Sequence, residues 1–263
     1  GPWADVSAGF AIYRVADLIR EHAGSVTAGF TTMRPDELDA GEVTVRIDYA
    51  SVNYKDALAA SGRGKIIRRF PCVGGIDAVG VVEAATDARL ARGGGVIVHS
   101  HGFGVSHHGG YAQWARVPAA WVNRLPEGLG PLDAITIGVA GYTAALAIDL
   151  MELNGTAPGR GQVLVNGATG GVASIAIDML ARRGYDVVAV TGKPAEAQYL
   201  RTLGAGSVIA ASGLDTGSRP LERARWGGAM ICSISRWRCE GESRAWFFSR
   251  MSRGWQRRGL VSS

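Results

Sequence analysis

Residues 162–174 read Gln-Val-Leu-Val-Asn-Gly-Ala-Thr-Gly-Gly-Val-Ala-Ser. The apolar run at 163–165 is typical of a buried parallel strand, and residues 172–180 after the glycines have helical periodicity. A glycine turn between a strand and a helix lets the backbone approach a pyrophosphate, which binds at the positive N-terminus of that helix. The stretch therefore predicts a βα unit that can bind a dinucleotide.

The glycine spacing in this stretch departs from the usual Gly-x-Gly-x-x-Gly fingerprint. It reads Gly-x-x-Gly-x-x-Ala, with Ala173 at the position of close helix–strand packing. Taken alone, an ordinary βα turn explains the pattern equally well. If a dinucleotide does bind, the turn residues that contact it are Gly167, Ala168, Thr169, Gly170, Gly171 and Val172.

The composition is that of a globular protein. The chain has 263 residues, of which 47% are hydrophobic, and its mean hydropathy is close to zero. No uninterrupted apolar run reaches the roughly 18 residues of a membrane span, and the first twenty residues lack a signal-peptide pattern. Three cysteines are too few for a disulfide framework. We therefore expect a cytoplasmic protein without a membrane partner.

The positive net charge of +5 is concentrated in one segment. The chain has 28 basic and 23 acidic residues, and residues 230–263 contain seven of the basic and two of the acidic ones. The remainder is balanced, with 21 of each sign, and has no basic footprint for nucleic acid. No nucleic-acid partner is expected for the main body.

The chain order predicts two domains and a tail. Residues 10–130 contain short strands separated by Gly and Pro, which indicates a compact β-rich barrel. These strands are expected at 43–49, where the pattern alternates, and at 79–84, 96–100, 111–117 and 121–125. Residues 131–229 alternate helix and strand, which indicates a doubly wound parallel sheet. Strands are expected at 162–166, 187–190, 207–210 and from 228. Helices are expected at 132–153, with an interruption at Gly138–Gly141, and at 170–183, 195–203 and 219–225. Residues 230–263 form an atypical basic tail.

The end of the second predicted strand of this sheet favours NADPH over NADH. An NAD site usually has an acidic residue there, about 20 residues past the fingerprint, to accept bonds from the ribose hydroxyls. This chain instead reads Val-Thr-Gly-Lys over residues 190–193. Thr191 and Lys193 can donate to a 2′-phosphate, which a carboxylate would repel.

Five motifs in order resemble one family: Asn53-Tyr-Lys-Asp56, Phe70-Pro-Cys-Val-Gly-Gly-Ile-Asp77, His108-Gly-Gly-Tyr-Ala112, Ala140-Gly-Tyr-Thr143 and Thr191-Gly-Lys193. From about Phe10 to Ala229 the chain is similar to the medium-chain dehydrogenase/reductase superfamily, in its YhdH/YhfP branch of quinone oxidoreductases, which includes NADPH-dependent acrylyl-CoA reductase. The resemblance implies an α/β protein with a GroES-like catalytic domain and a Rossmann domain. It also implies NADPH-driven reduction of an activated carbon–carbon double bond, and we allow for a homodimer.

The residues argue against the zinc branch of that superfamily. Zinc alcohol dehydrogenases have a Gly-His-Glu motif whose His binds the metal, and Ile76 stands at that position here. A cluster of histidines surrounds a glycine-rich loop without a matching set of cysteines or acids. We expect no metal, and we expect that loop to shape a pocket. The clustered histidines are His99, His101, His107 and His108.

Without a metal, an enoyl thioester must be polarised by hydrogen bonds, because negative charge develops on its oxygen and its α-carbon needs a proton. We expect Asn53 and Tyr54 to orient substrate or cofactor, and Asp56 and Asp77 to hold that network or relay the proton. From the residues alone, a helix cap for Asp56 and a turn for Asp77 are equally good explanations. The resemblance places Thr143 at the nicotinamide end of the cofactor.

Two segments depart from the family pattern. Residues 92–95 read Arg-Gly-Gly-Gly where the family has a proline-containing turn. The glycines should loosen this turn, at a cost in folding free energy of roughly 1 kcal/mol or more. After Ala229 the family continuation is missing, and we hypothesise local reading-frame slippage, which resequencing of the locus would test. The tail is then a disordered or poorly packed end, with a nucleic-acid arm as its functional rival.

Three functions stay open at this point. An enoyl-thioester reductase such as acrylyl-CoA reductase is the first. A quinone or enone reductase with the same hydride step is the second. A dinucleotide-binding protein without turnover is the third, because the part of the chain that completes the sheet in the family is altered.

Overall fold

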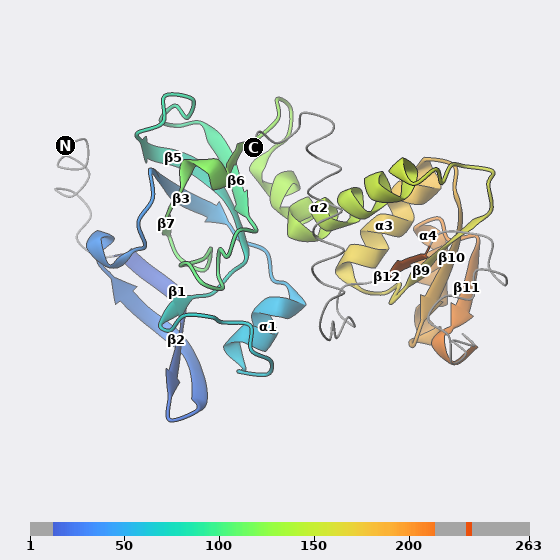
Figure 1. The fold of residues 1–263 in the computed structure, drawn as a ribbon, viewed down its shortest axis with the longest axis horizontal. Coiled ribbons are helices and arrows are strands. Elements are labelled where there is room, and N and C mark those ends of the chain that lie inside the picture. Colours follow the sequence, from blue (N-terminus) through green and yellow to red (C-terminus); the bar gives the residue numbers. More distant parts are fainter. Residues whose placement is uncertain (1–12, 214–229, 233–263) are drawn as a thin grey trace. The chain divides into compact units, whose positions relative to one another are not determined.

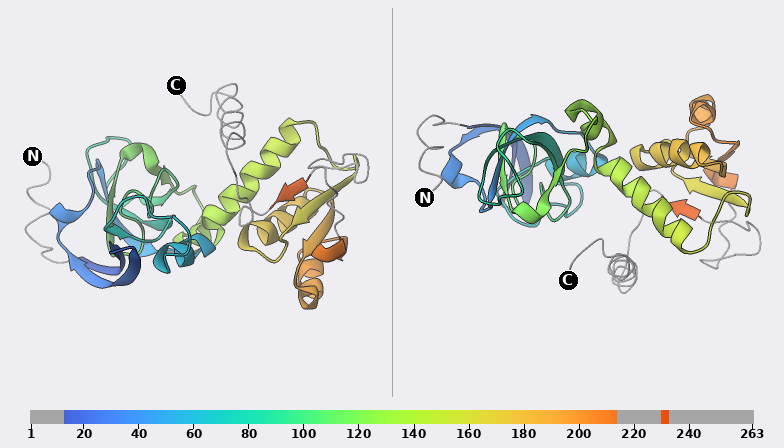
Figure 2. Two further views of the ribbon diagram at one scale, coloured as in Figure 1. Left: turned by 60° about the horizontal axis from the view of Figure 1, so that its bottom comes forward. Right: turned by 90° about the horizontal axis from the view of Figure 1, so that it is seen from above.

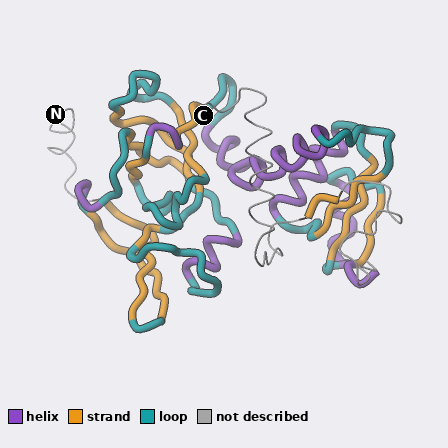
Figure 3. Tube along the Cα trace, in the orientation of Figure 1, coloured by secondary structure: helices purple, strands orange, loops and turns teal. Residues whose placement is uncertain are grey.

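The computed structural model describes residues 13–213 and 230–232, and Figure 1 shows their fold. The chain divides between Tyr142 and Thr143 into two compact units, and each is described by itself. Figure 3 shows that strands and loops dominate the first unit, whereas helices and strands alternate in the second. The predictions for a helix at 219–225 and for residues 233–263 lie outside the described residues.

The first unit is built on two antiparallel sheets. One has the order β7-β3-β5-β6-β8 and the other the order β2-β1-β4. The strands are β1 (Tyr13–His22), β2 (Ser25–Met33), β3 (Val43–Tyr49), β4 (Cys72–Val73), β5 (Asp77–Ala85), β6 (Gly95–His99), β7 (Trp114–Val117) and β8 (Val122–Arg124). The short helices are η1 (Pro35–Glu37), α1 (Tyr54–Ala60) and η2 (Ala119–Trp121).

Alternating valines build the core of the larger sheet. Val43 and Val45 of β3 are almost fully buried and pack with Val82 of β5 and Val96 of β6. Their alternation along each strand places them on one face of the sheet. The strands predicted at 43–49, 79–84 and 96–100 are therefore the centre of this unit.

The β1–β2 hairpin was not among the predicted elements. Its strands pair antiparallel, with His22 opposite Ser25 across the turn residues Ala23 and Gly24. Most described residues of β2 are exposed or half-buried, and Phe30 is 89% exposed. A strand with few buried positions has little apolar alternation, which explains why the sequence pattern did not reveal it.

The second unit is a four-stranded parallel sheet of order β11-β10-β9-β12. Figure 2 gives two further views, in which α3 runs alongside the sheet and β12 lies next to β9. Its elements are α2 (Pro131–Leu153), β9 (Gln162–Asn166), α3 (Gly171–Arg182), β10 (Asp186–Thr191), η3 (Pro194–Glu196), α4 (Ala197–Thr202), β11 (Ser207–Ala210), η4 (Ala211–Gly213) and β12 (Met230–Cys232). The first residues of α2 belong to the first unit.

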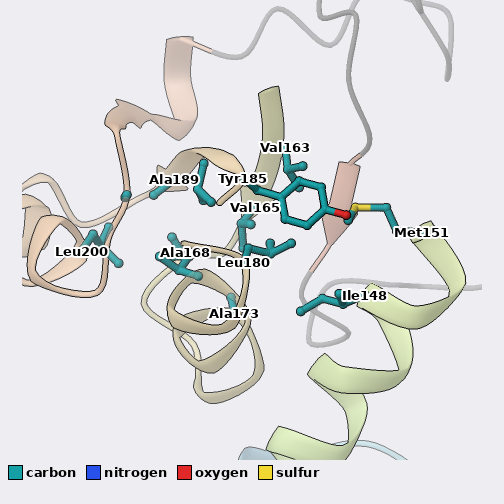
Figure 4. Packing of buried hydrophobic residues seen from close by; sticks show 13 residues of the cluster. Ile148, Met151, Val163, Val165, Ala168, Ala173, Leu180, Tyr185, Ala189 and Leu200 are labelled. Atoms are coloured by element: carbon teal, nitrogen blue, oxygen red, sulfur yellow. The ribbon is translucent and has the colours of Figure 1, made fainter. Parts of the chain in front are cut away.

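One face of this sheet is covered by helices. Figure 4 shows Ile148 and Met151 of α2 in one apolar core with Val163 and Val165 of β9, and Tyr185 pointing toward Met151. The same core contains Ala173, Leu180 and Leu200. The sheet is parallel and its strands alternate with helices, as predicted, because consecutive parallel strands need crossover connections.

Helix α2 is long and apolar enough to cross a membrane by length and composition. Polar residues such as Asp133 and Asp149 interrupt the segment, so it contains no uninterrupted apolar run of that length, although its mean hydropathy is high. The backbone is non-helical at Gly138, and 39% of the apolar window is buried within the protein. Ala134 and Ile135 lie in one apolar core and Ile148 in another. Helix α2 is therefore a core helix and not a membrane span.

Candidate functional site

Asp77 is the most completely buried charged residue of the first unit, with none of its surface exposed. It is the first residue of β5 and is not part of a turn. Both carboxylate oxygens lie 2.7 Å from Ser51 Oγ, and Oδ1 also accepts from Ser51 N at 3.2 Å. Oδ2 accepts from Val139 N at 3.0 Å. Asp77 thus holds two distant segments, the loop before α1 and the interrupted region of α2.

The break in α2 exists because of this carboxylate. Gly138 has a φ of +51°, and a Cβ atom there would lie 2.9 Å from Asp77 Oδ2. Val139 begins the next helical stretch and donates its N–H to Asp77, which acts as an N-cap supplied from another strand. Gly138 is therefore needed both for its backbone conformation and for the space beside Asp77.

Asn53 lies one hydrogen bond from this centre. Its Nδ2 donates to Ser51 Oγ at 2.8 Å, and the same Oγ contacts Asp77. A chain of polar groups therefore runs from a buried carboxylate through a hydroxyl to an amide. Asn53 is half-buried, so its side chain is both fixed by the chain and partly open to solvent.

Asp56 connects the start of α1 to the backbone before β5. It is 5% exposed, its Oδ2 accepts from Asn53 N at 2.9 Å, and its Oδ1 accepts from Ile76 N at 3.1 Å. Burial raises the pKa of Asp56, and hydrogen bonds from Asn53 and Tyr111 oppose that rise. The reach back to the Asn53 N–H is the carboxylate half of a capping box, so a cap is one demonstrated role of Asp56.

Tyr54 stands apart from the buried network. It begins α1 and is 67% exposed, so its hydroxyl is not fixed as the Asn53 amide is. Two residues that sequence reasoning did not single out belong to the network instead: Ser51, which links Asn53 to Asp77, and Tyr111, whose hydroxyl donates to Ser51 O at 3.0 Å. Tyr111 stands inside a quoted motif and Ser51 two residues before one, yet a serine or tyrosine there has no distinguishing sequence signal.

A groove of about 920 Å³ in the same unit does not contain the predicted catalytic residues. It is open and mostly apolar, and only Ala50 and Tyr111 connect it to the network around Ser51. Its lining is Phe30, Thr31, Thr32, Ile47, Asp48, Tyr49, Ala50, Gly110, Tyr111, Ala112 and Gln113.

The histidine cluster is engaged in contacts of its own. His101 stacks on Trp121 with ring centroids 5.5 Å apart, and His107 meets the same ring edge-on at 4.9 Å. His108 Nδ1 accepts from Val73 N at 3.0 Å, and burial lowers the pKa of His108. Over the described ranges, no three His, Cys, Asp or Glu side chains are grouped closely enough for a metal.

In the second unit, the glycine-rich stretch forms the predicted βα turn. Gly167 has a φ of +66° and its N–H donates to Asn166 Oδ1 at 2.8 Å, while Ala168 N bonds to Val190 O at 3.0 Å. Gly170 N donates to Gly167 O at 2.8 Å, which closes the turn around Thr169.

The N-terminus of α3 fits a phosphate. Gly170 is the N-cap, and the first intrahelical bond runs from Ser174 N to Gly170 O, so the N–H groups of Gly171 and Val172 precede the helical ladder. Free N–H groups and the helix dipole together favour an anion. Ala173 is buried in the core, in agreement with its predicted packing position.

The last residue of β10 and the turn after it fit a 2′-phosphate. Thr191 ends the strand and is buried, and its Oγ1 accepts from Lys193 N at 3.0 Å. This bond turns the chain so that the exposed Lys193 follows directly, as the N-cap of η3. No carboxylate stands between Val187 and Ala195 to repel a phosphate. Thr143 lies on α2, where the second unit begins, and is half-buried.

Comparisons with known proteins agree with this architecture. Residues 39–127 match the family described as the alcohol dehydrogenase GroES-like domain. The chain is 44% identical to acrylyl-CoA reductase AcuI of Ruegeria pomeroyi, over 81% of this chain and 67% of that protein. The chain spans about two thirds of the length of the curated relatives it matches.

Two solved structures share the fold at high similarity. YhdH oxidoreductase of Salmonella enterica in complex with NADP has a TM-score of 0.79 and 41% identity, covering 84% of this chain and 67% of that one. YhfP of Bacillus subtilis with NAD bound has a TM-score of 0.78 and 33% identity, covering 92% and 88%. These matches confirm the predicted α/β class, with its GroES-like and Rossmann parts. The chain therefore belongs to the family of acrylyl-CoA reductase AcuI and the YhdH and YhfP oxidoreductases, within the medium-chain dehydrogenase/reductase superfamily.

Proposed function

We propose that this protein is an NADPH-dependent oxidoreductase that reduces the activated carbon–carbon double bond of a short enoyl-CoA such as acrylyl-CoA. The observation that carries the proposal is the chain of polar groups Asp77–Ser51–Asn53, which fixes an amide donor without a metal. Relatives named as acrylyl-CoA reductases support the substrate class.

The residues have different roles in this proposal. Bound NADPH would supply the hydride. The Asn53 amide and the Tyr54 hydroxyl would donate to the thioester oxygen, where negative charge develops as the β-carbon is reduced. Asp77 would keep Ser51, and through it Asn53, in place. Asp56, whose pKa is raised by burial, is the candidate for supplying the α-carbon proton, either directly or through Tyr54.

The cofactor would be held by the second unit. The turn residues Gly167–Val172 would bind the pyrophosphate, and Thr191 and Lys193 the 2′-phosphate of NADPH. Thr143 would contact the nicotinamide end. A structure of the YhdH relative with NADP supports the choice of cofactor, whereas the YhfP relative was crystallised with NAD. The 2′-phosphate contacts at Lys193 are therefore the point to test.

The direct test follows NADPH oxidation by absorbance after acrylyl-CoA is added to purified protein. We expect oxidation with acrylyl-CoA and a much slower rate with NADH. Replacement of Lys193 by Gln should raise KM for NADPH about tenfold and leave KM for NADH unchanged, since one charge-assisted phosphate contact contributes about 1.5 kcal/mol. Equal loss with both cofactors would contradict the assignment of Lys193.

A quinone or enone reductase is the second candidate, favoured by the relative named as quinone oxidoreductase YhfP. It would use the same cofactor and the same donors. Steady-state rates with acrylyl-CoA and with a quinone separate the two, and a higher kcat/KM for the quinone would reject the first. Binding of NADPH without oxidation by any acceptor would indicate a dinucleotide-binding protein. A cytoplasmic location and a homodimer stay predictions.

A further inference from the structure

Residues 55–69, called the basic loop below, begin inside the Asn53–Asp56 motif, run through α1 and continue into the loop after it. Residues 55–69 contain five basic side chains and a single acidic one, Asp56. Asp56 is buried and accepts hydrogen bonds from two backbone N–H groups, and its charge affects Lys55 less than that of Arg68 does. The basic side chains are Lys55, Arg63, Lys65, Arg68 and Arg69.

Four of these cations lack a counter-ion. Arg69 pairs with Asp39 at 2.5 Å. Across residues 13–213 and 230–232, no carboxylate forms an ion pair with any of the other four cations. Six exposed arginines elsewhere in the described chain do have such partners, whereas single ones such as Arg124 have none: the paired ones are Arg34, Arg46, Arg89, Arg92, Arg182 and Arg183. The loop is therefore a local excess of positive charge that no ion pair within residues 13–213 and 230–232 balances.

The backbone that carries these cations is anchored. Ile67 is 8% exposed and packs in a core with Ile19 and Cys72, and Ile66 packs against the same core. Arg68 N donates to Val105 O at 2.9 Å. Apolar side chains thus point inward while the side chains of Arg63, Lys65 and Arg68 are exposed, so the charges are held on a fixed surface.

Lys55 and Arg68 lie close enough to affect each other. Burial lowers the pKa of Lys55, and the positive charge of Arg68 lowers it further, against a smaller opposing effect of the Asp56 carboxylate. An anion between or beside the two side chains would relieve this repulsion. Lys55 directly follows Tyr54 in the chain and stands two residues after Asn53, so the first of the basic side chains is next to the proposed hydrogen-bond donors in sequence.

We propose that Lys55, Arg63, Lys65 and Arg68 bind the phosphate groups of the CoA part of the thioester substrate. The inference rests on the proposed function and assigns its substrate a second contact. A CoA thioester has its reactive acyl group at one end and a diphosphate and a 3′-phosphate at the other. Arginine and lysine are the side chains suited to these phosphates. Lys55 belongs to the motif that would bind the acyl end, the other three follow in the chain, and Arg68 is close enough to Lys55 to affect its pKa.

The binding test uses CoA itself as the probe, measured by isothermal titration calorimetry, so that it does not depend on turnover. The triple variant Arg63→Gln/Lys65→Gln/Arg68→Gln should weaken CoA binding about tenfold, because each exposed charge contributes about 0.5 kcal/mol. The control Arg124→Gln removes an exposed arginine of β8 that has no ion pair within the described part of the chain, and it should bind CoA as the wild type does.

The kinetic test compares acrylyl-CoA with acrylyl-pantetheine, which lacks the phosphates. The triple variant should raise KM for acrylyl-CoA about tenfold and leave kcat, KM for acrylyl-pantetheine and KM for NADPH unchanged. A rise in KM for NADPH alone would overturn the proposal, because the loop would then serve the dinucleotide.

Two further results separate this inference from the proposed function. CoA affinity that is unchanged in the triple variant, or absent in the wild type, overturns the inference even if acrylyl-pantetheine is reduced. Loss of CoA affinity in a protein that reduces nothing supports the inference and rejects the function. Circular dichroism checks that the variants fold, and the single variant Arg63→Gln, with an expected two- to threefold loss of CoA affinity, decides the matter if the triple variant does not fold.

Discussion

At the scale of single residues, the structure gives Asp77 a role that can be measured apart from catalysis. Its carboxylate accepts hydrogen bonds from Ser51 and from the N–H of Val139. Removing its charge leaves these donors with a weaker acceptor in a buried place. Because Asp77 also fixes Ser51, the same change should disturb the position of Asn53.

We expect Asp77→Asn to lower the free energy of unfolding by about 1–3 kcal/mol. Urea denaturation followed by circular dichroism measures this. The control Asp178→Asn removes one partner of an exposed ion pair with Arg182 and should change stability by less than about 0.5 kcal/mol. Equal effects from the two variants would contradict the buried role of Asp77.

His108 predicts a pH dependence of stability. Burial lowers its pKa below the ordinary value of 6.5, with a smaller opposing effect from Asp39, and its Nδ1 accepts from Val73 N. The unfolded chain therefore binds the proton more tightly than the folded one does. The stabilising contribution is fully present above pH 6.5 and is lost as the pH falls through the folded-state pKa.

Wild-type protein should thus lose stability between about pH 7.5 and 5.5, and His108→Asn should lose less over the same range. The asparagine can still accept a bond from Val73 N but cannot titrate there. Thermal unfolding at several pH values measures the difference. Parallel curves for the two proteins would show that His108 does not cause the dependence. His99, whose pKa is also lowered by burial, is present in both proteins and contributes to the slope that remains.

At the scale of elements, the interruption of α2 is the feature with a clear physical cause. The sequence predicted a long helix with a break at Gly138–Gly141, and the structure places the non-helical residue at Gly138. Apolar periodicity revealed the helix, but no local pattern indicates that a carboxylate from β5 caps its second part. That contact joins residues far apart in the chain.

Replacement of Gly138 by Ala should destabilise the protein by more than about 1 kcal/mol. The residue has a positive φ, and the added Cβ would crowd Asp77 Oδ2. Gly29→Ala is the matched control, because a Cβ there meets nothing within 4 Å and its φ is not positive. Chemical denaturation of both variants decides, and a neutral Gly138→Ala would show that the break has another origin.

The β5–β6 turn shows how a glycine-rich segment can be ordered. Gly93 has a φ of +82°, and its N–H donates to Val82 O at 2.7 Å, while Val82 N bonds to Gly94 O at 3.0 Å. The three glycines of residues 92–95 were expected to loosen this turn, because glycines have more conformational freedom to lose when the unfolded chain folds. In the folded chain, backbone hydrogen bonds hold the turn.

At the scale of the whole molecule, a bound dinucleotide should stabilise the fold by mass action. At a concentration of 100 times Kd, NADP⁺ should add about 2.7 kcal/mol to the free energy of unfolding. NAD⁺ at the same concentration should add clearly less, because Thr191 and Lys193 then contact no 2′-phosphate. Thermal shift assays measure both, with Lys193→Gln as the control that removes the difference. Equal shifts from the two cofactors in the wild type would contradict the NADPH assignment.

The sequence by itself determined the elements and the family. The apolar run and glycines of 162–174 predicted a strand, a turn and a helix, since buried strands and glycine turns leave a local pattern. Motifs such as Asn53–Asp56 and Thr191–Lys193 predicted the fold class and indicated the cofactor. The β1–β2 hairpin was missed because its exposed strand lacks such a pattern.

Only the tertiary structure decided which of the candidate residues are held together, and how. The Asp77–Ser51–Asn53 chain, the cap on Val139 and the uncompensated cations of residues 55–68 all depend on distances between segments that the sequence separates. Periodicity reports which side of an element is buried, but a hydrogen bond or an unpaired charge depends on what the rest of the chain places beside it. For that reason Ser51 emerged only from the folded chain, although it stands two residues before the predicted Asn53.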